Sequence, residues 1–273
     1  MKKHTPASMT DSINLNNALK EAVRAAKGAG KLMKQNFLVA KKVNSSTLHD
    51  IKLELDVRCQ KLIEDHLAEK FPHISALGEE GITGKVGTTA RWVIDPIDGT
   101  VNFAHQIPHA CVSIALQLPL ENGEYQTVVG VVYDPFCDEL WTAIRGQKAH
   151  LNGVVIHVSD RSQLRHAITA IGFSKTKKSL ETTLPYLEGL LKRTRKVRLM
   201  GSAALALTYV ASGRFDGYVE RGISLWDVAA GGLIVECAGG EFWSEPIPGK
   251  FKLRMIATNG LIRRKLESIP GLS

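Results

Sequence analysis

Two aspartates three residues apart are the strongest chemical signal in the chain. Asp95 and Asp98 follow the apolar, β-branched run that starts at Trp92, and Pro96 stiffens the backbone between them. Both carboxylates can therefore face one centre, where they would repel each other strongly unless a cation lay between them. Oxygen ligands on a tight loop suit Mg²⁺, which binds through a few carboxylates, waters and a substrate phosphate.

The residues after this pair favour an anion beside the cation. Gly99 lets the backbone approach an anion closely, and the N–H groups of Gly99 and Thr100 would be available donors if a helical turn began there. The segment is then a loop for metal and phosphate at the end of a buried strand. A plain surface turn is the alternative, because Asp, Pro and Gly are the usual turn residues.

Two other segments supply acidic residues that could join this site. Glu79 stands between glycines after a short strand-like stretch and shortly before Asp95, so we expect it to share a metal with Asp95. Asp227 begins a helical pattern through Val235. It is either a third carboxylate that helps to hold a second cation or a simple helix cap.

Hydrophobic periodicity predicts the elements that must position these residues. We expect a mixed α/β protein with a large sheet, and a hairpin turn at Asn152-Gly153. The expected helices cover 15–37, about 50–71, 180–192, 202–212 and 226–235, with a further helix at the end of the chain, and the expected strands cover 74–78, 92–95, 110–118, 127–133, 140–144, 149–158, 168–173 and 255–258.

Composition is that of a globular protein in a reducing compartment. The 273 residues are 44% hydrophobic and 23% charged, enough for one large or two small domains. No segment reads as a signal peptide or a membrane anchor. The four cysteines, Cys59, Cys111, Cys137 and Cys237, are far apart, so we expect free thiols, no structural zinc and a cytoplasmic location.

The positive charge has one dense cluster. The chain carries a net charge of +8, and the run from Lys192 to Arg198 holds five basic residues in seven positions. Such a run usually forms a solvated face. Because no aromatic residues interleave with it and no nucleic-acid motif is present, we do not expect direct binding of RNA or DNA.

Three separated blocks together resemble one family, the inositol monophosphatase family of Mg²⁺-dependent, lithium-sensitive phosphatases. The similarity covers nearly the whole chain. The blocks are Gly78-Glu79-Glu80, then Trp92–Phe103 with Pro108, and finally Trp226–Gly231 with Glu236 and Ala238-Gly239-Gly240.

The resemblance implies an α/β (α+β) fold, the layered αβαβα sandwich of the inositol monophosphatase and fructose bisphosphatase type, usually a homodimer. We expect residues 1–12 to be a disordered leader and 13–273 to be one phosphatase unit with a soft subdivision near 160. The first half, 13–160, would carry the metal loop, and the second, 161–273, would carry Asp227 and the substrate pocket.

The resemblance also implies roles for individual residues. One Mg²⁺ would be held by Glu79, Asp95 and the Ile97 carbonyl. A second would be held by Asp95, Asp98 and Asp227, and Glu79 would also touch a weaker third ion. The Thr100 hydroxyl, supported by Asp56, would orient the attacking water together with Glu79. The positions that match substrate contacts are Asp98, Gly99, Thr100, Gly201, Ser202, Ala203, Glu220 and Asp227.

The chain departs from the family pattern before Asp56. The family commonly has Asp-x-Val-Thr-x-x-Asp there, whereas this chain has Leu53 at the threonine position and Lys52 beside it, with Asp50 and Asp56 retained. The added positive charge could bind phosphate or replace a metal contact. The third ion and the lithium sensitivity therefore stay open.

The implied activity is hydrolysis of a small phosphorylated alcohol, with inositol 1-phosphate, cleaved to myo-inositol and phosphate, as the default. Histidinol phosphate, fructose 1,6-bisphosphate and phosphoadenosine phosphate are alternatives within the same chemistry, since Glu220 suits polyol hydroxyls and an amine equally. An alternative of another class is a partner of RNA polymerase in transcription antitermination, a role that some bacterial members have without catalysis.

Overall fold

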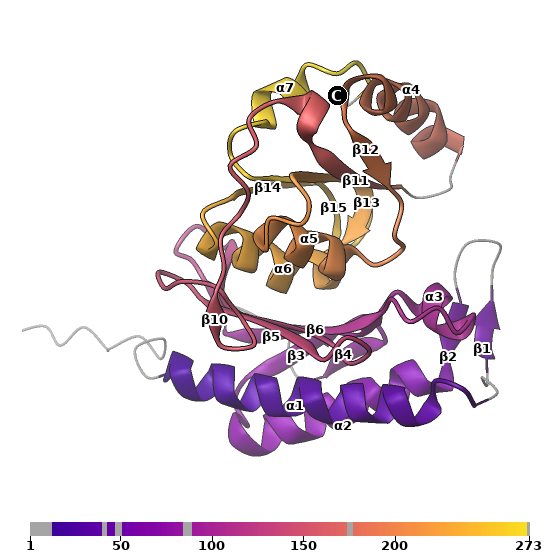
Figure 1. Ribbon diagram of the computed structural model, residues 1–273. Coiled ribbons are helices and arrows are strands. Elements are labelled where there is room, and N and C mark those ends of the chain that lie inside the picture. The colour runs from indigo at the N-terminus through magenta and orange to yellow at the C-terminus, as the bar shows by residue number, and fades with distance from the viewer. Residues whose placement is uncertain (1–12, 40–42, 47–50, 84–88, 174–176, 272–273) are drawn as a thin grey trace, which may run out of the picture.

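Two stacked β-sheets, with helices between them and on both outer faces, build the protein (Figure 1). This computed structural model describes residues 13–39, 43–46, 51–83, 89–173 and 177–271. The expected leader at 1–12 and Asp50 lie outside these ranges. The layers run helix, sheet, helix, sheet, helix, which confirms the predicted α/β sandwich.

The first outer layer consists of α1 (Leu15–Asn36) and α2 (Glu54–Lys70). Asn14 caps α1 by accepting the Asn17 N–H at 3.0 Å. The face of α1 that meets the sheet is mostly alanine, which allows a close approach. The second helix begins later than expected, because residues 51–53 instead form β2 (Ile51–Leu53), paired with β1 (Val43–Ser46).

The next layer is an eight-stranded sheet in which only β3 and β5 are parallel neighbours. The hairpin expected at Asn152-Gly153 is confirmed, with φ values of +49° and +80° that match a type I′ turn. The strand order is β10 (Val154–Val155), β9 (His150–Leu151), β8 (Glu139–Ile144), β7 (Tyr125–Asp134), β6 (Cys111–Pro119), β5 (Arg91–Asp98), β3 (Ser75–Gly78) and β4 (Gly81–Thr83).

Strand β5 does not end at Asp95 as predicted but continues through Asp98. Residues three apart on a regular strand point to opposite faces of the sheet. Here Asp95 pairs with Ser113 and Asp98 pairs with Cys111, so β5 holds one extra residue in this interval. This bulge places both aspartates on the same face of the sheet. The prediction had instead relied on a loop after Asp95 to bring the two carboxylates together.

The middle layer consists of α5 (Ala203–Ala211) and α6 (Leu225–Cys237), which lie between the two sheets (Figure 1). Both helices are apolar around their whole circumference, as expected for helices buried on two sides. Their side chains form one continuous core with both sheets. The N-termini of these helices are the parts that reach the candidate site.

The last two layers are a five-stranded sheet and the outer helices α4 (Lys177–Arg193) and α7 (Arg263–Glu267). A single 3₁₀ turn, η2 (Leu164–His166), leads into this sheet. The strand order is β12 (Lys196–Arg198), β11 (Ile168–Phe173), β13 (Gly217–Ser224), β15 (Lys252–Thr258) and β14 (Glu241–Pro246).

Six strands, β1, β2, β4, β12, β13 and β14, were not predicted, and as a result the sequence indicated one large sheet instead of two. Strand β12 lies within the basic run, where Lys196 and Arg198 face solvent from the edge of the sheet. All four cysteines are free, as expected, and Cys59 and Cys111 are buried. None of the helices in the described ranges is long and apolar enough to cross a membrane.

One backbone contact fixes α6 against the eight-stranded sheet. A Cβ atom at Gly130 of β7 would lie 2.8 Å from the carbonyl oxygen of Ala230 in α6. Only glycine permits this approach, because both sides of the contact are main chain. The contact therefore helps to set the position of the helix that carries Asp227.

We predict that Gly130→Ala destabilises the protein by about 1–3 kcal/mol, because the added methyl group overpacks a rigid contact. Gly28→Ala is the control: its nearest neighbour is the flexible Leu62 Cδ2 at 3.2 Å. Alanine in a helix should stabilise there by up to about 1 kcal/mol. Urea unfolding of both variants measures the two effects, and equal effects would contradict the prediction.

Candidate active site

Four acidic side chains from distant parts of the chain gather around Asp95. Glu79, Asp98, Asp227 and Asp56 all act electrostatically on the Asp95 carboxyl group. They come from the ends of β3 and β5 and from the first turns of α2 and α6. The structure thus brings together the acidic residues that the sequence singled out.

Burial and mutual repulsion shift the pKa values of these groups upward. Burial, followed by the charges of Glu79, Asp98 and Asp227, raises the pKa of Asp95 well above its usual range. Burial, with Asp98 nearby, raises the pKa of Asp227 to about 7. The carboxyl groups of Asp227 and Asp95 also lie within hydrogen-bonding contact of each other.

A hard divalent cation is chemically suited to this donor set, because all the side-chain donors are carboxylates and a bound cation would offset their mutual repulsion. The ligands are not preassembled: within the described ranges, no three His, Cys, Asp or Glu side chains are arranged to hold a metal ion. A cation would therefore have to draw these neighbouring carboxylates together.

Asp98 is held by the N-terminus of α5. Its Oδ2 accepts the Ser202 hydroxyl at 2.6 Å and the Ala204 N–H at 2.7 Å, and its Oδ1 accepts the Ala203 N–H at 3.2 Å. These bonds partly offset the upward pKa shift that burial causes. Two of the predicted substrate residues, Ser202 and Ala203, thus contact a predicted metal ligand directly.

Asp56 and Asp227 also cap the helices that carry them. Asp56 Oδ2 accepts the Leu53 N–H at 2.7 Å at the start of α2, and Asp227 Oδ2 accepts the Ser224 N–H at 2.9 Å at the start of α6. The capping alternative for Asp227 is therefore correct. It does not exclude a role in the site, because the same carboxyl group also lies within hydrogen-bonding contact of Asp95.

The turn after Asp98 has the expected form. Helix α3 (Thr100–Ala104) begins directly after Gly99, which has φ = +93°. A Cβ atom at Gly99 would also lie 2.9 Å from the His109 carbonyl oxygen, so both conformation and space require glycine. The Thr100 hydroxyl donates to the Ile97 carbonyl at 2.8 Å, and the Ile97 N–H donates to Asp95 Oδ1 at 3.0 Å.

A cavity of about 370 Å³ adjoins this acidic cluster. Asp98 and Asp227 line it together with Gly201, Ser202, Ala203 and Glu220, so it joins predicted metal ligands to predicted substrate contacts. Its described lining does not include Glu79, Gly99 or Thr100.

Glu220 is half-buried at the wall of this cavity. Gly172 on the neighbouring strand leaves space for its carboxyl group, which accepts the Tyr218 hydroxyl. Burial raises the pKa of Glu220 to about 8. The sequence had marked Glu220 but neither Tyr218, its neighbour two residues before on the same strand, nor Gly172, whose role depends on the pairing of β11 with β13.

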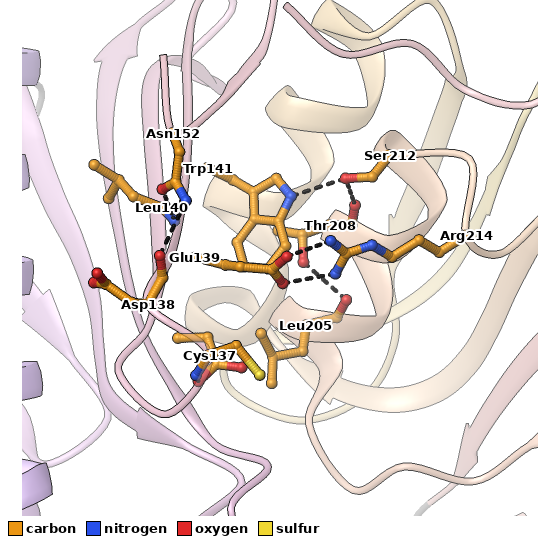
Figure 2. A network of polar contacts seen from close by, with 11 residues as sticks. Cys137, Asp138, Glu139, Leu140, Trp141, Asn152, Leu205, Thr208, Ser212 and Arg214 are labelled. Carbon is orange, nitrogen blue, oxygen red and sulfur yellow. Dashed lines mark hydrogen bonds and ion pairs between the residues drawn. The ribbon is translucent and has the colours of Figure 1, made fainter. Parts of the chain in front are cut away.

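A polar network braces the C-terminal end of α5 against β8 (Figure 2). The Trp141 indole N–H donates to Ser212 Oγ, and Ser212 Oγ in turn bonds to the Thr208 carbonyl, both at 2.8 Å. Arg214 makes two hydrogen bonds to Glu139 and lies over the Trp141 ring. The network holds α5 in place, and thus its N-terminus at Asp98.

Asn102 is a positioning residue that the sequence analysis missed. Its Nδ2 donates to the Met200 carbonyl at 2.8 Å and to the His109 carbonyl at 2.9 Å. Both acceptors are carbonyls, which fixes the orientation of the amide. Asn102 thereby ties α3 to the segment that precedes α5, and nothing in its local sequence indicates this long-range contact.

We predict that Asn102→Asp destabilises the protein by at least about 2 kcal/mol, because two donor contacts become contacts between a carboxylate and carbonyls. Asn122→Asp is the control, since Asn122 makes its hydrogen bonds in an exposed turn. Thermal or urea unfolding measures both. Equal stability of the two variants would show that Asn102 does not tie the segments together.

Comparison with known proteins agrees with this geometry. A sequence model of the inositol monophosphatase family matches residues 14–246. The inositol monophosphatase of Mesembryanthemum crystallinum is 39% identical over 266 residues, which cover 93% of this chain and 96% of that protein. Nus factor SuhB of Escherichia coli K12 is 40% identical over 225 residues, which cover 80% of this chain and 82% of that protein.

The fold has close structural counterparts. The crystal structure of extragenic suppressor protein suhB from Bartonella henselae superimposes with a TM-score of 0.84 at 35% identity, covering 92% of this chain and 97% of that one. The family match, the sequence relatives and the shared fold lead to one conclusion. The chain belongs to the inositol monophosphatase family and is a phosphoric monoester hydrolase.

Proposed function

We propose that this protein hydrolyses the phosphate monoester of a small alcohol with the help of Mg²⁺, and that inositol 1-phosphate, cleaved to myo-inositol and phosphate, is the default substrate. The observation that carries the proposal is the group of acidic side chains around buried Asp95, beside a cavity lined by Asp98, Asp227 and Glu220. Relatives named inositol monophosphatase support the choice of substrate.

Two Mg²⁺ ions would bind to residues of this cluster. Glu79, Asp95 and the Ile97 carbonyl would hold one, and Asp95, Asp98 and Asp227 the other. Bound there, the ions would neutralise phosphate oxygens and the developing charge on the leaving alcohol. A third ion at Glu79 and inhibition by Li⁺ are further parts of the proposal, and they depend on the segment where Leu53 replaces the usual threonine.

Other residues of the chain would position the reactants. Glu79 and the Thr100 hydroxyl, with Asp56 behind them, would orient the attacking water. The Gly99 and Thr100 N–H groups would bind phosphate oxygens at the start of α3. Gly201, Ser202, Ala203 and Glu220 would contact the alcohol, which lies on the far side of the phosphate from the water in an in-line displacement. We also propose a cytoplasmic homodimer.

The substrate alternatives remain within this chemistry. Histidinol phosphate, fructose 1,6-bisphosphate and phosphoadenosine phosphate each present a phosphate monoester to the same acidic cluster. These substrates differ in the chemical group that would reach Glu220. The Glu220 carboxyl group could accept a hydrogen bond from a hydroxyl or from an ammonium group. A phosphate-release screen over these compounds and inositol 1-phosphate, with and without Li⁺, separates them.

We predict that Asp95→Asn abolishes Mg²⁺-dependent release of phosphate from inositol 1-phosphate. The variant replaces a carboxyl group whose charged form burial and the neighbouring carboxylates disfavour, so the metal-free protein should become more stable. Mg²⁺ should then no longer raise the unfolding temperature, because stabilisation by a ligand requires binding to the folded state. Phosphate release and thermal unfolding with Mg²⁺ or with EDTA measure both effects.

Asp65→Asn serves as the matched control for that variant. Asp65 lies on the exposed face of α2 and pairs only with Lys61 among the ion pairs found there. Both its activity and its response to Mg²⁺ should equal those of the unaltered protein. Turnover that survives in Asp95→Asn, or an intact thermal response to Mg²⁺, would overturn the proposed site.

A second candidate function is association with RNA polymerase in transcription antitermination. The relatives named Nus factor SuhB, at 38–42% identity, favour it. If binding is independent of catalysis, Asp95→Asn should retain RNA polymerase in a pull-down as well as the unaltered protein does. Failure of both proteins to retain the polymerase would leave the enzymatic function alone.

A further inference from the structure

The cavity beside the acidic cluster has two chemically different parts. Asp98 and Asp227 mark the end nearest the proposed metal ligands. The rest of the described lining is mainly hydrocarbon, and it comes from β11, β13, α5 and the segment before α5. Its apolar members are Ala170, Phe173, Leu199, Met200, Ala203, Ala206, Ile223 and the ring of Tyr218.

The polar side chains of the cavity are already engaged with the protein. The Ser202 hydroxyl donates to Asp98, and the Tyr218 hydroxyl donates to Glu220. Asp98 accepts three donors from the start of α5, and Asp227 accepts the Ser224 N–H. Among the described side chains, what remains for an alcohol is acceptor capacity on carboxyl groups, chiefly at Glu220, because each carboxyl oxygen has further lone-pair positions.

The mouth of the cavity is apolar as well. Leu199 is 57% exposed although it lines the cavity, and Phe173 and Met200 beside it are half-buried. A hydroxyl-rich ring could leave its hydroxyl groups in water there, but contact with these apolar side chains would add no binding free energy. A hydrocarbon group would remove their surface from water together with its own.

We propose that the alcohol recognised by this protein has a largely hydrocarbon body and one hydrogen-bond donor that reaches Glu220. This proposal rests on the proposed phosphatase function and deepens it. Inositol 1-phosphate would still be hydrolysed, since its phosphate meets the same acidic cluster. Its remaining hydroxyl groups, however, exceed the free acceptors that the described side chains of the cavity offer, and unpaired polar groups oppose binding in an apolar site.

Three phosphate esters with the same six-membered ring test the proposal directly. These are cyclohexyl phosphate, trans-2-hydroxycyclohexyl phosphate and inositol 1-phosphate, which differ only in their hydroxyl groups. We expect kcat/KM to be about tenfold higher for the monohydroxy ester than for inositol 1-phosphate. The electron-withdrawing hydroxyls make inositol the better leaving group, so intrinsic reactivity cannot produce this order.

Leu199→Ser tests whether the apolar mouth causes the preference. We expect the ratio of kcat/KM for cyclohexyl phosphate to that for inositol 1-phosphate to fall about tenfold, the loss expected when roughly two methylene-sized contacts disappear. Leu191→Ser is the matched control, because Leu191 is 61% exposed on α4 and does not line the cavity. Phe173→Ala is a second variant at the same mouth.

The outcomes separate this inference from the proposed function. A preference for the cyclohexyl esters that weakens in Leu199→Ser and Phe173→Ala, but not in Leu191→Ser, supports the inference. A preference for inositol 1-phosphate, with the ratio unchanged in every variant, overturns the inference while the phosphatase function stands. If no ester releases phosphate with Mg²⁺ present, both are overturned.

Discussion

Repulsion among buried carboxylates is the constraint on which the rest of the site depends. Asp95 is surrounded by the charges of four other acidic residues, and burial removes the water that would otherwise weaken the repulsion. The repulsion and burial together raise the pKa values of Asp95 and Asp227. A cation would offset the repulsion, because it neutralises several carboxylates at once.

The fold supports this cluster with the N-termini of three helices. Asp56 accepts a backbone N–H at the start of α2, Asp98 does so at the start of α5, and Asp227 at the start of α6. The positive end of each helix dipole therefore faces one acidic residue. Asp95 and Glu79 have no such helix, and Asp95 is the group whose pKa burial and its neighbours raise well above the usual range.

The sequence predicted the elements better than their pairing. The long helices, the hairpin at Asn152-Gly153 and the pair Asp95 and Asp98 all carry local signals. The bulge that puts the two aspartates on one face does not, because it depends on register with β6. Strand β12 was missed for a similar reason: its charged residues face solvent, and only its partner β11 makes it a strand. The metal and substrate roles of the site residues stay predictions.

The two ends of the cavity are mechanically coupled through the start of α5. Ser202 and Ala203 line the alcohol end and also bind Asp98, while Asn102 fixes the preceding segment through the Met200 carbonyl. A substitution at Ser202 would therefore disturb the acidic cluster along with the alcohol pocket. Leu199 and Phe173 make none of these contacts to Asp98. A substitution at the mouth of the cavity can thus alter its apolar lining without loosening the carboxylates, so the proposed alcohol pocket and the acidic cluster can vary separately.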